Sequence, residues 1–265
     1  RERHFVKALP AEMSKPTTLR QLDDNELVAL ADYRTPGEDS LNMTLRVLSG
    51  APRVFEISNF LSTIEVQHIL EIAQASTLDE STLGDEKSKS RKVRTSRNSW
   101  VARRESPVID AIYRRAADLM RIDEGLMRKR APTEIANVPE GRPFTDKSIA
   151  EELQLVHYSE GQEYQTHHDF AYAPSTESTG SARFATLLLY LNDDMEGGET
   201  SFPKFLNAHT FLELKVKPEI GKAVLFYSQL PDGNMDEFSQ HKAHIVRENY
   251  KWLINLWVWD PVRYS

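Results

Sequence analysis

The sequence contains no cysteine, which excludes disulfide bonds, zinc–thiolate centres and thiol nucleophiles. It also lacks any apolar run near the roughly 20 residues that a membrane-spanning helix needs. Positive charge is not in excess either, because the 265 residues carry a net charge of −7. General nucleic-acid binders gain their affinity by neutralising phosphates, so this acidic balance argues against that class. The remaining composition is that of a globular protein long enough to bury a substantial core.

The N-terminal part of the chain differs from the rest. Residues 1–50 are polar and mixed, and we interpret them as an extension of unknown role, with an amphipathic stretch at 19–31 that favours a helix. Residues 51–265 carry the regular patterns and are predicted to form the functional domain. Within them, residues 123–148 contain three prolines and show no period, which indicates an inserted loop.

Two helices are predicted after a strand at 52–60. The first begins at Ser62, which forms a capping box with Glu65 because each side chain can satisfy a free backbone N–H of the first turn. The second begins at Ser106, with Pro107 in its first turn. Both segments repeat apolar residues at helical spacing, so each helix should bury one face.

From residue 153 onward, short apolar runs alternate with turn signals. Such regular punctuation is typical of an antiparallel barrel or jelly roll. The runs lie at 153–158, 182–191, 223–227, 243–246 and 252–259. Together with the helices, they predict an α+β fold that is mainly β, with a double-stranded β-helix (jelly-roll) core and flanking N-terminal helices.

The triplet His167-His168-Asp169 is the first candidate for chemistry. Residues two apart on a strand point to the same face, so His167 and Asp169 should converge while His168 points away. Two histidines and one carboxylate on one side of an octahedron leave positions open, which suits non-haem Fe(II). A His-x-Asp triplet alone also occurs by chance on edge strands, so its surroundings decide the interpretation. The third ligand has to come from a downstream histidine, and there are three: His209, His241 and His244.

Several motifs accompany this triplet in a fixed order. They are His157-Tyr158-x-x-Gly161-Gln162-x-Tyr164, Thr186-x-x-x-Tyr190-Leu191, Gly197-Gly198-Glu199-Thr200-x-Phe202-Pro203, Gly221-x-Ala223-x-x-Phe226, His241 and Lys251-Trp252. Over about residues 52–260 the set resembles the catalytic domain of prolyl 4-hydroxylases, both the plant and algal type and the collagen type. The resemblance implies a dioxygenase that uses Fe(II), 2-oxoglutarate and O2, with ascorbate among its cofactors.

The resemblance also implies a ligand set for iron, namely His167, Asp169 and His241. The family places its distal histidine ten residues before a lysine, and Lys251 follows His241 at that spacing. His244 is the local rival for the third position.

The last predicted strand provides a physical check on Lys251. One face carries Lys251, Leu253, Asn255, Trp257 and Trp259, and the opposite face is wholly apolar and should pack under the helices. A lysine beside tryptophans inside the barrel is costly unless it is paired, and the distal carboxylate of 2-oxoglutarate would pair with it. By resemblance, Tyr158 and Thr200 also hydrogen-bond this cosubstrate, and Trp257 lies close to it.

The reaction and the substrate follow from the resemblance as well. Prolyl 4-hydroxylases hydroxylate C4 of prolyl residues while converting 2-oxoglutarate to succinate and CO2. The partner would be a proline-containing protein or peptide in extended polyproline II form. By resemblance, Tyr164, Arg183 and Trp259 are candidates for substrate binding. Segments 77–97 and 172–182 are expected to cover the substrate.

Two departures from the family pattern leave the substrate open. Trp259 stands where the family has a histidine that contacts substrate, and compact members lack the 123–148 insertion. The alternatives are a dioxygenase acting on a different protein side chain, a silent relative that binds Pro-rich peptides, and a cupin-type isomerase. Neither of the last two needs Lys251. The resemblance favours the lumen of the endoplasmic reticulum or Golgi, which would imply an anchor segment ahead of Arg1, and the cytosol is the alternative.

Overall fold

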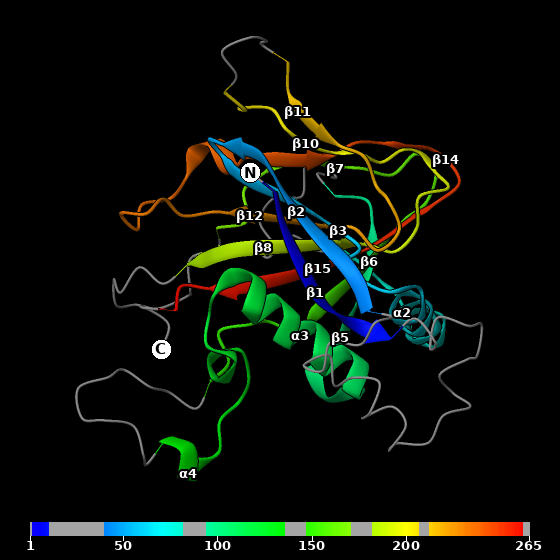
Figure 1. The fold of residues 1–265 in the computed structure, drawn as a ribbon. Coiled ribbons are helices and arrows are strands. Elements are labelled where there is room, and N and C mark those ends of the chain that lie inside the picture. The colour runs from blue at the N-terminus through cyan, green and yellow to red at the C-terminus, as the bar shows by residue number, and fades with distance from the viewer. Residues whose placement is uncertain are drawn as a thin grey trace.

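The computed structural model describes residues 2–10, 40–81, 94–135, 147–170, 182–206 and 212–261, with side chains from residue 43 onward. Within these ranges the chain forms two facing antiparallel sheets, and helices pack on the outer face of the larger one (Figure 1). The predicted α+β, mainly β class with flanking helices is confirmed.

The larger sheet has nine strands in the described residues, and every pairing in it is antiparallel. Their order across the sheet is β1 (Glu2–Pro10), β2 (Ser40–Gly50), β3 (Arg53–Ser58), β12 (Ala223–Tyr227), β8 (Arg183–Tyr190), β15 (Lys251–Trp259), β6 (Leu153–Tyr158), β5 (Arg97–Val101) and β4 (Asp79–Glu80). The four runs predicted at 153–158, 182–191, 223–227 and 252–259 all form strands of this sheet.

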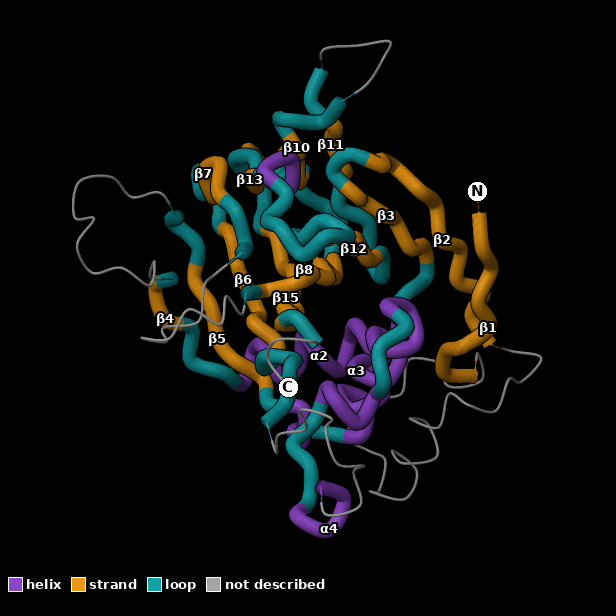
Figure 2. Tube along the Cα trace, turned by 90° about the vertical axis from the view of Figure 1, so that its left-hand side faces the viewer, coloured by secondary structure: helices purple, strands orange, loops and turns teal. Residues whose placement is uncertain are grey.

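A smaller sheet faces the middle of the larger one. Its order is β11 (Leu214–Val216), β10 (Thr200–Phe202), β13 (His241–Ala243) and β7 (Tyr164–His167). A two-stranded sheet pairs β14 (Val246–Glu248) with β9 (Glu196–Gly197). Figures 1 and 2 show the smaller sheet on one side of β8 and β15 and the helices on the other.

The two long helices begin where their capping residues predict. In α2 (Thr63–Ala75), the Ser62 hydroxyl accepts from the Glu65 N–H and the Glu65 carboxylate accepts from the Ser62 N–H. In α3 (Pro107–Met120), the Ser106 hydroxyl accepts from a backbone N–H of the first turn. Short helices lie at η3 (Arg103–Glu105), just before α3, and at η4 (Glu124–Met127), α4 (Pro132–Ile135) and η5 (Glu237–Ser239).

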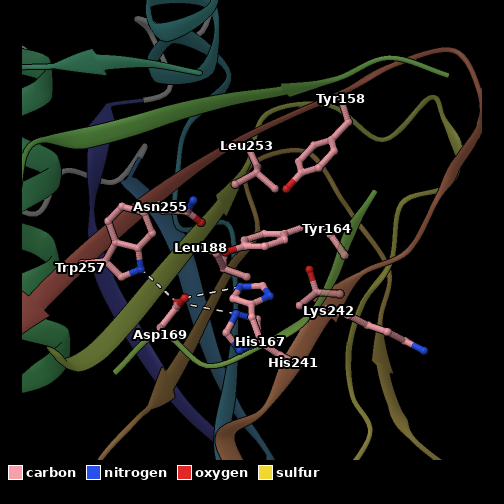
Figure 3. A pocket seen from close by; sticks show the side chains of 12 residues that line it. Tyr158, Tyr164, His167, Asp169, Leu188, His241, Lys242, Leu253, Asn255 and Trp257 are labelled. Carbon is pink, nitrogen blue, oxygen red and sulfur yellow. Dashed lines mark hydrogen bonds and ion pairs between the residues drawn. The ribbon is translucent and has the colours of Figure 1, made fainter. Parts of the chain in front are cut away.

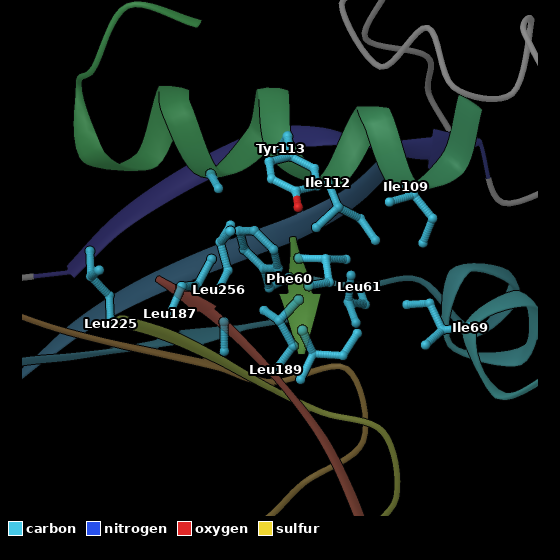
Figure 4. Close-up of a cluster of buried hydrophobic side chains, with 14 of the residues drawn as sticks. Phe60, Leu61, Ile69, Ile109, Ile112, Tyr113, Leu187, Leu189, Leu225 and Leu256 are labelled. Atoms are coloured by element: carbon cyan, nitrogen blue, oxygen red, sulfur yellow. The ribbon is translucent and has the colours of Figure 1, made fainter. Parts of the chain in front are cut away.

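Two apolar cores lie on opposite faces of the larger sheet. One fills the space between this sheet and the helices, where α3 lies over the strands (Figure 4). The other lies between the two sheets and contains Val156, Leu188 and Leu253. The alternation of β15 separates them, since Ile254, Leu256 and Val258 pack on the helix side.

Trp259 departs from this alternation. It was expected on the same face as Lys251, but its ring packs against the helix-side core. The pairing of β15 with β8 shifts between Val258 and Trp259, which pair with Ala185 and Arg183. The partners skip Phe184, so the extra residue of this irregularity lies on β8.

The strand predicted at 243–246 is wrong in its bounds. The chain leaves β13 at Ala243 and enters β14 at Val246, and the intervening backbone bonds to another segment: the His244 N–H donates to the Glu199 carbonyl. Sequence patterns also missed β7, β9, β10 and β11, because strands of two to four residues are too short to show an alternation.

The first 50 residues are partly continuous with the larger sheet. Here β2 pairs with β3 and β1 pairs with β2, so the boundary expected at residue 50 falls between two adjacent strands of one sheet. The helix expected at 19–31, most of the 172–182 segment and much of the 123–148 insertion lie outside the described residues. In the part of the chain that is described, no helix is long and apolar enough to cross a membrane.

Candidate metal centre and active site

Three potential metal ligands converge between the sheets. His167 ends β7, Asp169 follows two residues later, and His241 opens β13 directly opposite His167. The two carboxylate oxygens of Asp169 lie 3.6 Å from the Nε2 atoms of His167 and His241 (Figure 3). One donor atom from each of the three residues lies within 4.8 Å of the others.

The other candidate histidines lie elsewhere. His168 points away, as the alternation predicts, and its Nε2 contacts the Glu237 carbonyl at 3.2 Å. His244 Nε2 lies 3.0 Å from Ser201 Oγ and 3.4 Å from Glu213, so it takes no part in the cluster. His209 lies outside the described residues.

The tautomers of the two clustered histidines suit a metal. His167 Nδ1 lies 2.7 Å from the Gln165 carbonyl and His241 Nδ1 lies 3.0 Å from the Ser239 carbonyl. A carbonyl only accepts, so each Nδ1 carries the proton and each Nε2 presents its lone pair to the cluster. Burial, together with His241, lowers the pKa of His167 to about 3, so this imidazole is neutral at pH 7.

Asp169 is ionised and fixed in orientation. Burial alone would raise its pKa, but His241, His167 and the Trp257 N–H hold that pKa below its ordinary value. Its Oδ2 accepts hydrogen bonds from the Thr186 hydroxyl at 2.7 Å and from Trp257 Nε1 at 3.0 Å. These two donors, which are paired residues of β8 and β15, leave Oδ1 free to bind a metal.

A pocket extends from the cluster between the sheets. Its lining combines apolar side chains with a few hydroxyl and amide groups (Figure 3). Beyond the three ligands, the residues that line it are Tyr158, Tyr164, Leu188, Thr200, Lys242, Ala243, Leu253, Asn255 and Trp257.

Lys251 is buried beside this pocket, behind Tyr158, and has no carboxylate partner among the described residues. It is fully inaccessible, and its Nζ donates to the Gly198 carbonyl at 2.6 Å. Its ammonium lies 5.6 Å from the centroid of the Tyr158 ring and 5.4 Å from that of Tyr190. Among the described residues, no carboxylate lies within ion-pair distance of Nζ. Burial therefore lowers the pKa of Lys251 to about 7, although Glu199 opposes this shift.

Hydroxyl groups near Lys251 can donate hydrogen bonds to a ligand in the pocket. The Tyr190 hydroxyl donates to Thr200 Oγ1 at 2.8 Å, so the Thr200 hydrogen is available for another acceptor. Burial raises the pKa of both Tyr158 and Tyr190, so both phenols stay protonated. Tyr158 and Thr200 line the pocket and the lysine lies directly behind Tyr158, and a lysine with neighbouring hydroxyl donors is suited to bind a carboxylate.

Aromatic and basic residues also lie around the cluster. The Tyr164 ring stacks on His167, with centroids 3.5 Å apart. Arg183 forms a bidentate pair with Glu151 at 2.6 and 2.9 Å, and its guanidinium lies 3.9 Å from the centroid of Trp257. Trp259 is 6.0 Å from the same guanidinium and does not line the pocket.

Comparison with known proteins decides the family. Residues 153–259 match the model of the 2OG-Fe(II) oxygenase superfamily. Probable prolyl 4-hydroxylase 3 of Arabidopsis thaliana is 32% identical over 226 residues, which cover 80% of this chain and 71% of that protein. The chain belongs to the prolyl 4-hydroxylase family. It is accordingly an Fe(II)- and 2-oxoglutarate-dependent dioxygenase, whose superfamily uses Fe(II), 2-oxoglutarate and O2.

Two solved prolyl hydroxylase structures share the jelly-roll fold. The viral collagen prolyl hydroxylase of Paramecium bursaria Chlorella virus 1, in complex with 2-oxoglutarate, is 23% identical, covers 78% of this chain and 95% of its own, and has a TM-score of 0.54. A prolyl hydroxylase from Trichoplax adhaerens, in complex with a hypoxia-inducible-factor peptide, is 16% identical, covers 93% and 95%, and has a TM-score of 0.53.

Sequence reasoning on this prolyl 4-hydroxylase missed the supporting residues. Thr186 and Tyr190 belong to one of the family motifs, but the sequence assigned them no function. In the structure Thr186 hydrogen-bonds Asp169, and Tyr190 hydrogen-bonds Thr200. The signal was available, because they are polar positions four apart on an otherwise apolar strand and so share one face. That face also carries Leu188, which lines the pocket.

Proposed function

We propose that this enzyme hydroxylates prolyl residues of protein or peptide substrates to 4-hydroxyproline, with conversion of 2-oxoglutarate and O2 to succinate and CO2. The observation that carries the proposal is that the pocket at the His167, Asp169 and His241 cluster is also lined by Tyr158, whose ring lies 5.6 Å from a buried lysine with no carboxylate partner among the described residues. A metal alone would not require that lysine, whereas a metal together with a dicarboxylate cosubstrate does.

The three clustered side chains would hold Fe(II). Two imidazole Nε2 atoms and one carboxylate oxygen would face the metal together, which leaves coordination positions for cosubstrate and O2. When bound, this iron supplies the activation of O2 that is coupled to decarboxylation of 2-oxoglutarate. Thr186 and Trp257 keep Asp169 in place without occupying a coordination position.

Lys251, Tyr158 and Thr200 would bind the distal carboxylate of 2-oxoglutarate. Lys251 gives a charge-assisted hydrogen bond, while Tyr158 and Thr200 donate through hydroxyls. Leu188 and Leu253 line the pocket and exclude water from the cosubstrate. The charges of iron, Asp169, 2-oxoglutarate and Lys251 cancel, so the filled pocket is neutral.

The substrate would approach on the side of Tyr164, Arg183 and Trp257. The relatives are named as prolyl 4-hydroxylases, and an aromatic surface suits a prolyl ring in a polyproline II segment. Glu151 holds Arg183 over the Trp257 ring, which keeps this side of the pocket ordered before substrate arrives. Ascorbate would serve as the reductant that sustains turnover.

The test is succinate release from 2-oxoglutarate with Fe(II) and ascorbate, with and without a proline-rich peptide. We expect the peptide to stimulate release and mass spectrometry to find the peptide heavier by one oxygen. His241→Ala should abolish release, because one ligand of three is lost. His244→Ala is the matched control, since this nearby histidine stands outside the cluster, and it should keep most of the activity.

Each alternative outcome has a distinct meaning. Turnover that no proline peptide stimulates would retain the dioxygenase chemistry and reject prolyl substrates. Absence of turnover in protein shown to bind Fe(II) and 2-oxoglutarate would reject the proposed reaction.

A further inference from the structure

The hydroxyl of Tyr158 has hydrogen-bond partners that the proposed function does not use. Burial raises the pKa of Tyr158, and Arg94 and Ser96, which both hydrogen-bond this hydroxyl, oppose the rise. A guanidinium can only donate, so the phenol oxygen accepts from Arg94. Tyr158 also lines the pocket (Figure 3). The direction of its bond with Ser96 therefore decides whether it has a hydrogen to give to a ligand there.

Ser96 lies in the middle of a hydrogen-bonded row that reaches the edge of the larger sheet. Its side chain is buried, and its Oγ accepts from Arg94 Nε at 2.8 Å. The same Oγ lies 2.9 Å from Ser81 Oγ, which accepts from Asn98 Nδ2 at 2.9 Å. Ser81 directly follows the edge strand β4, Asn98 belongs to β5, and both are half-buried. The row thus joins the sheet edge to the cosubstrate site.

The available donors give this row a direction. The Asn98 Nδ2 group can only donate, so it fills an acceptor position on Ser81, and Arg94 does the same on Ser96. Each serine hydroxyl then passes its single hydrogen inward, from Ser81 to Ser96 and from Ser96 to Tyr158. In this direction the last free hydrogen is that of Tyr158. In the opposite direction Tyr158 would give its hydrogen to Ser96 and have none for a carboxylate, which can only accept. Hydrogen bonds that run in one direction also strengthen one another.

The position of Arg94 in this network is itself fixed. Its Nη2 donates at 3.2 Å to Oε1 of the buried Gln154, which also accepts from Asn255 Nδ2 at 3.0 Å. Within the described ranges, no carboxylate forms an ion pair with Arg94. Its positive charge therefore adds to the attraction for an anion near Tyr158.

We propose that Ser96, supported by Ser81 and Asn98, is a positioning residue that makes the Tyr158 hydroxyl a donor to the distal carboxylate of 2-oxoglutarate. The proposal rests on the proposed function, because it takes this carboxylate as the ligand of Tyr158. Ser96, Ser81 and Asn98 do not line the pocket, so they act through Tyr158. The edge of the larger sheet thereby contributes to cosubstrate affinity.

The experiment measures affinity instead of turnover. The protein is loaded with Fe(II) without O2 and titrated with 2-oxoglutarate, or with oxalate, which can chelate the metal but has no distal carboxylate. For Ser96→Ala we expect affinity for 2-oxoglutarate to fall about three- to tenfold, because Tyr158 loses the neighbour that directs its hydrogen. Ser81→Ala, one step farther away, should lower it about two- to threefold. Affinity for oxalate should be unchanged in both variants.

A double-mutant cycle separates positioning from a merely structural role. Tyr158→Phe removes the hydroxyl through which Ser96 acts, so adding Ser96→Ala to it should cause no further loss of 2-oxoglutarate affinity. Ser81→Thr retains a hydroxyl and should keep the affinity of the unmodified protein. Ser99→Ala is the matched control on β5: Ser99 pairs with Leu155, which packs in the helix-side core, so it belongs to the opposite face and its loss should not alter binding.

Three results would overturn the proposal. They are unchanged 2-oxoglutarate affinity in Ser96→Ala, an equal loss of affinity for oxalate, or an effect that persists in the Tyr158→Phe background. Failure of the proposed function looks different: an unmodified protein that binds 2-oxoglutarate but hydroxylates no prolyl peptide would reject the substrate, and the titrations would still decide for Ser96. An unmodified protein that binds no 2-oxoglutarate would reject both proposals.

Discussion

At the scale of single residues, the orientation of Asp169 depends on two hydrogen bonds. Thr186 and Trp257 both donate to Oδ2. Thr186→Val keeps the shape of the side chain and removes one donor, so we expect Fe(II) affinity to fall about tenfold. Anaerobic titration with Fe(II) measures this change without requiring turnover.

The matched control for this variant is Thr186→Ser, which retains the hydroxyl. It should restore most of the metal affinity. Equal affinities in the valine variant and the unmodified enzyme would show that Trp257 alone positions Asp169.

Lys251 makes cosubstrate binding sensitive to pH. In the free pocket burial lowers its pKa to about 7, and an adjacent carboxylate would raise that pKa again. The protein therefore takes up a proton as 2-oxoglutarate binds, over the range from pH 7 to about 10. Affinity should fall as pH rises through this range, by at most about tenfold per pH unit.

Calorimetry of metal-loaded protein in buffers with different ionisation enthalpies reports the proton uptake directly. Lys251→Gln carries no titrating group, so it should bind 2-oxoglutarate weakly at every pH and without this uptake. A slope that persists in the glutamine variant would assign the titration to another group.

The residue scale also marks where sequence reasoning ends. The face of Lys251 was predictable, because alternation along β15 fixes which side chains share a face. The convergence of His167 and Asp169 was expected by the same rule, although Asp169 lies two residues beyond the end of β7. Trp259 was expected to share the face of Lys251, and its contact with the helix-side core occurs where the pairing of β15 with β8 becomes irregular, which the apolar pattern does not reveal.

At the scale of elements, one buried ion pair joins the two long helices. Arg115 of α3 contacts both carboxylate oxygens of Glu65, at 2.6 and 3.0 Å, and donates to the Phe60 carbonyl at 2.5 Å. Glu65 also caps α2, so it serves two elements at once. The sequence predicted the cap, but the ion pair joins residues 50 positions apart and was not foreseeable from either helix alone.

Removal of one partner should therefore cost far more than the loss of a helix cap. For Glu65→Ala we expect the free energy of unfolding to fall by about 3–5 kcal/mol, because Arg115 is left buried without its carboxylate. Ser62→Ala, which loses only a cap, should cost about 1 kcal/mol. Urea denaturation followed by circular dichroism measures the free energy of unfolding of both variants. Similar losses in the two would show that the ion pair contributes little beyond the helix cap.

At the scale of the whole molecule, the sequence predicted the larger sheet with its covering helices, but it did not predict the smaller sheet that faces this larger sheet across the pocket. The apolar runs that form β6, β8, β12 and β15, together with the two capped helices, predicted a jelly roll with flanking helices. The smaller sheet, which carries two of the three candidate ligands, consists of strands of three or four residues whose pairings are visible only in the folded chain. The ligand set came from family resemblance, and the structure supplied the contacts that surround it.

The alternation of β15 has a consequence for how such an enzyme can change over time. Its inward side chains face the pocket and its outward ones face the helices. This one strand therefore separates the residues of the active site from those of the helix-side core. A substitution at an inward position such as Asn255 can reshape the pocket while leaving the helix-side core untouched. Outward positions such as Leu256 can drift with the helices without disturbing the reaction. Selection can thus act on specificity and on stability as nearly independent traits, because they depend on alternate residues of the same nine-residue strand.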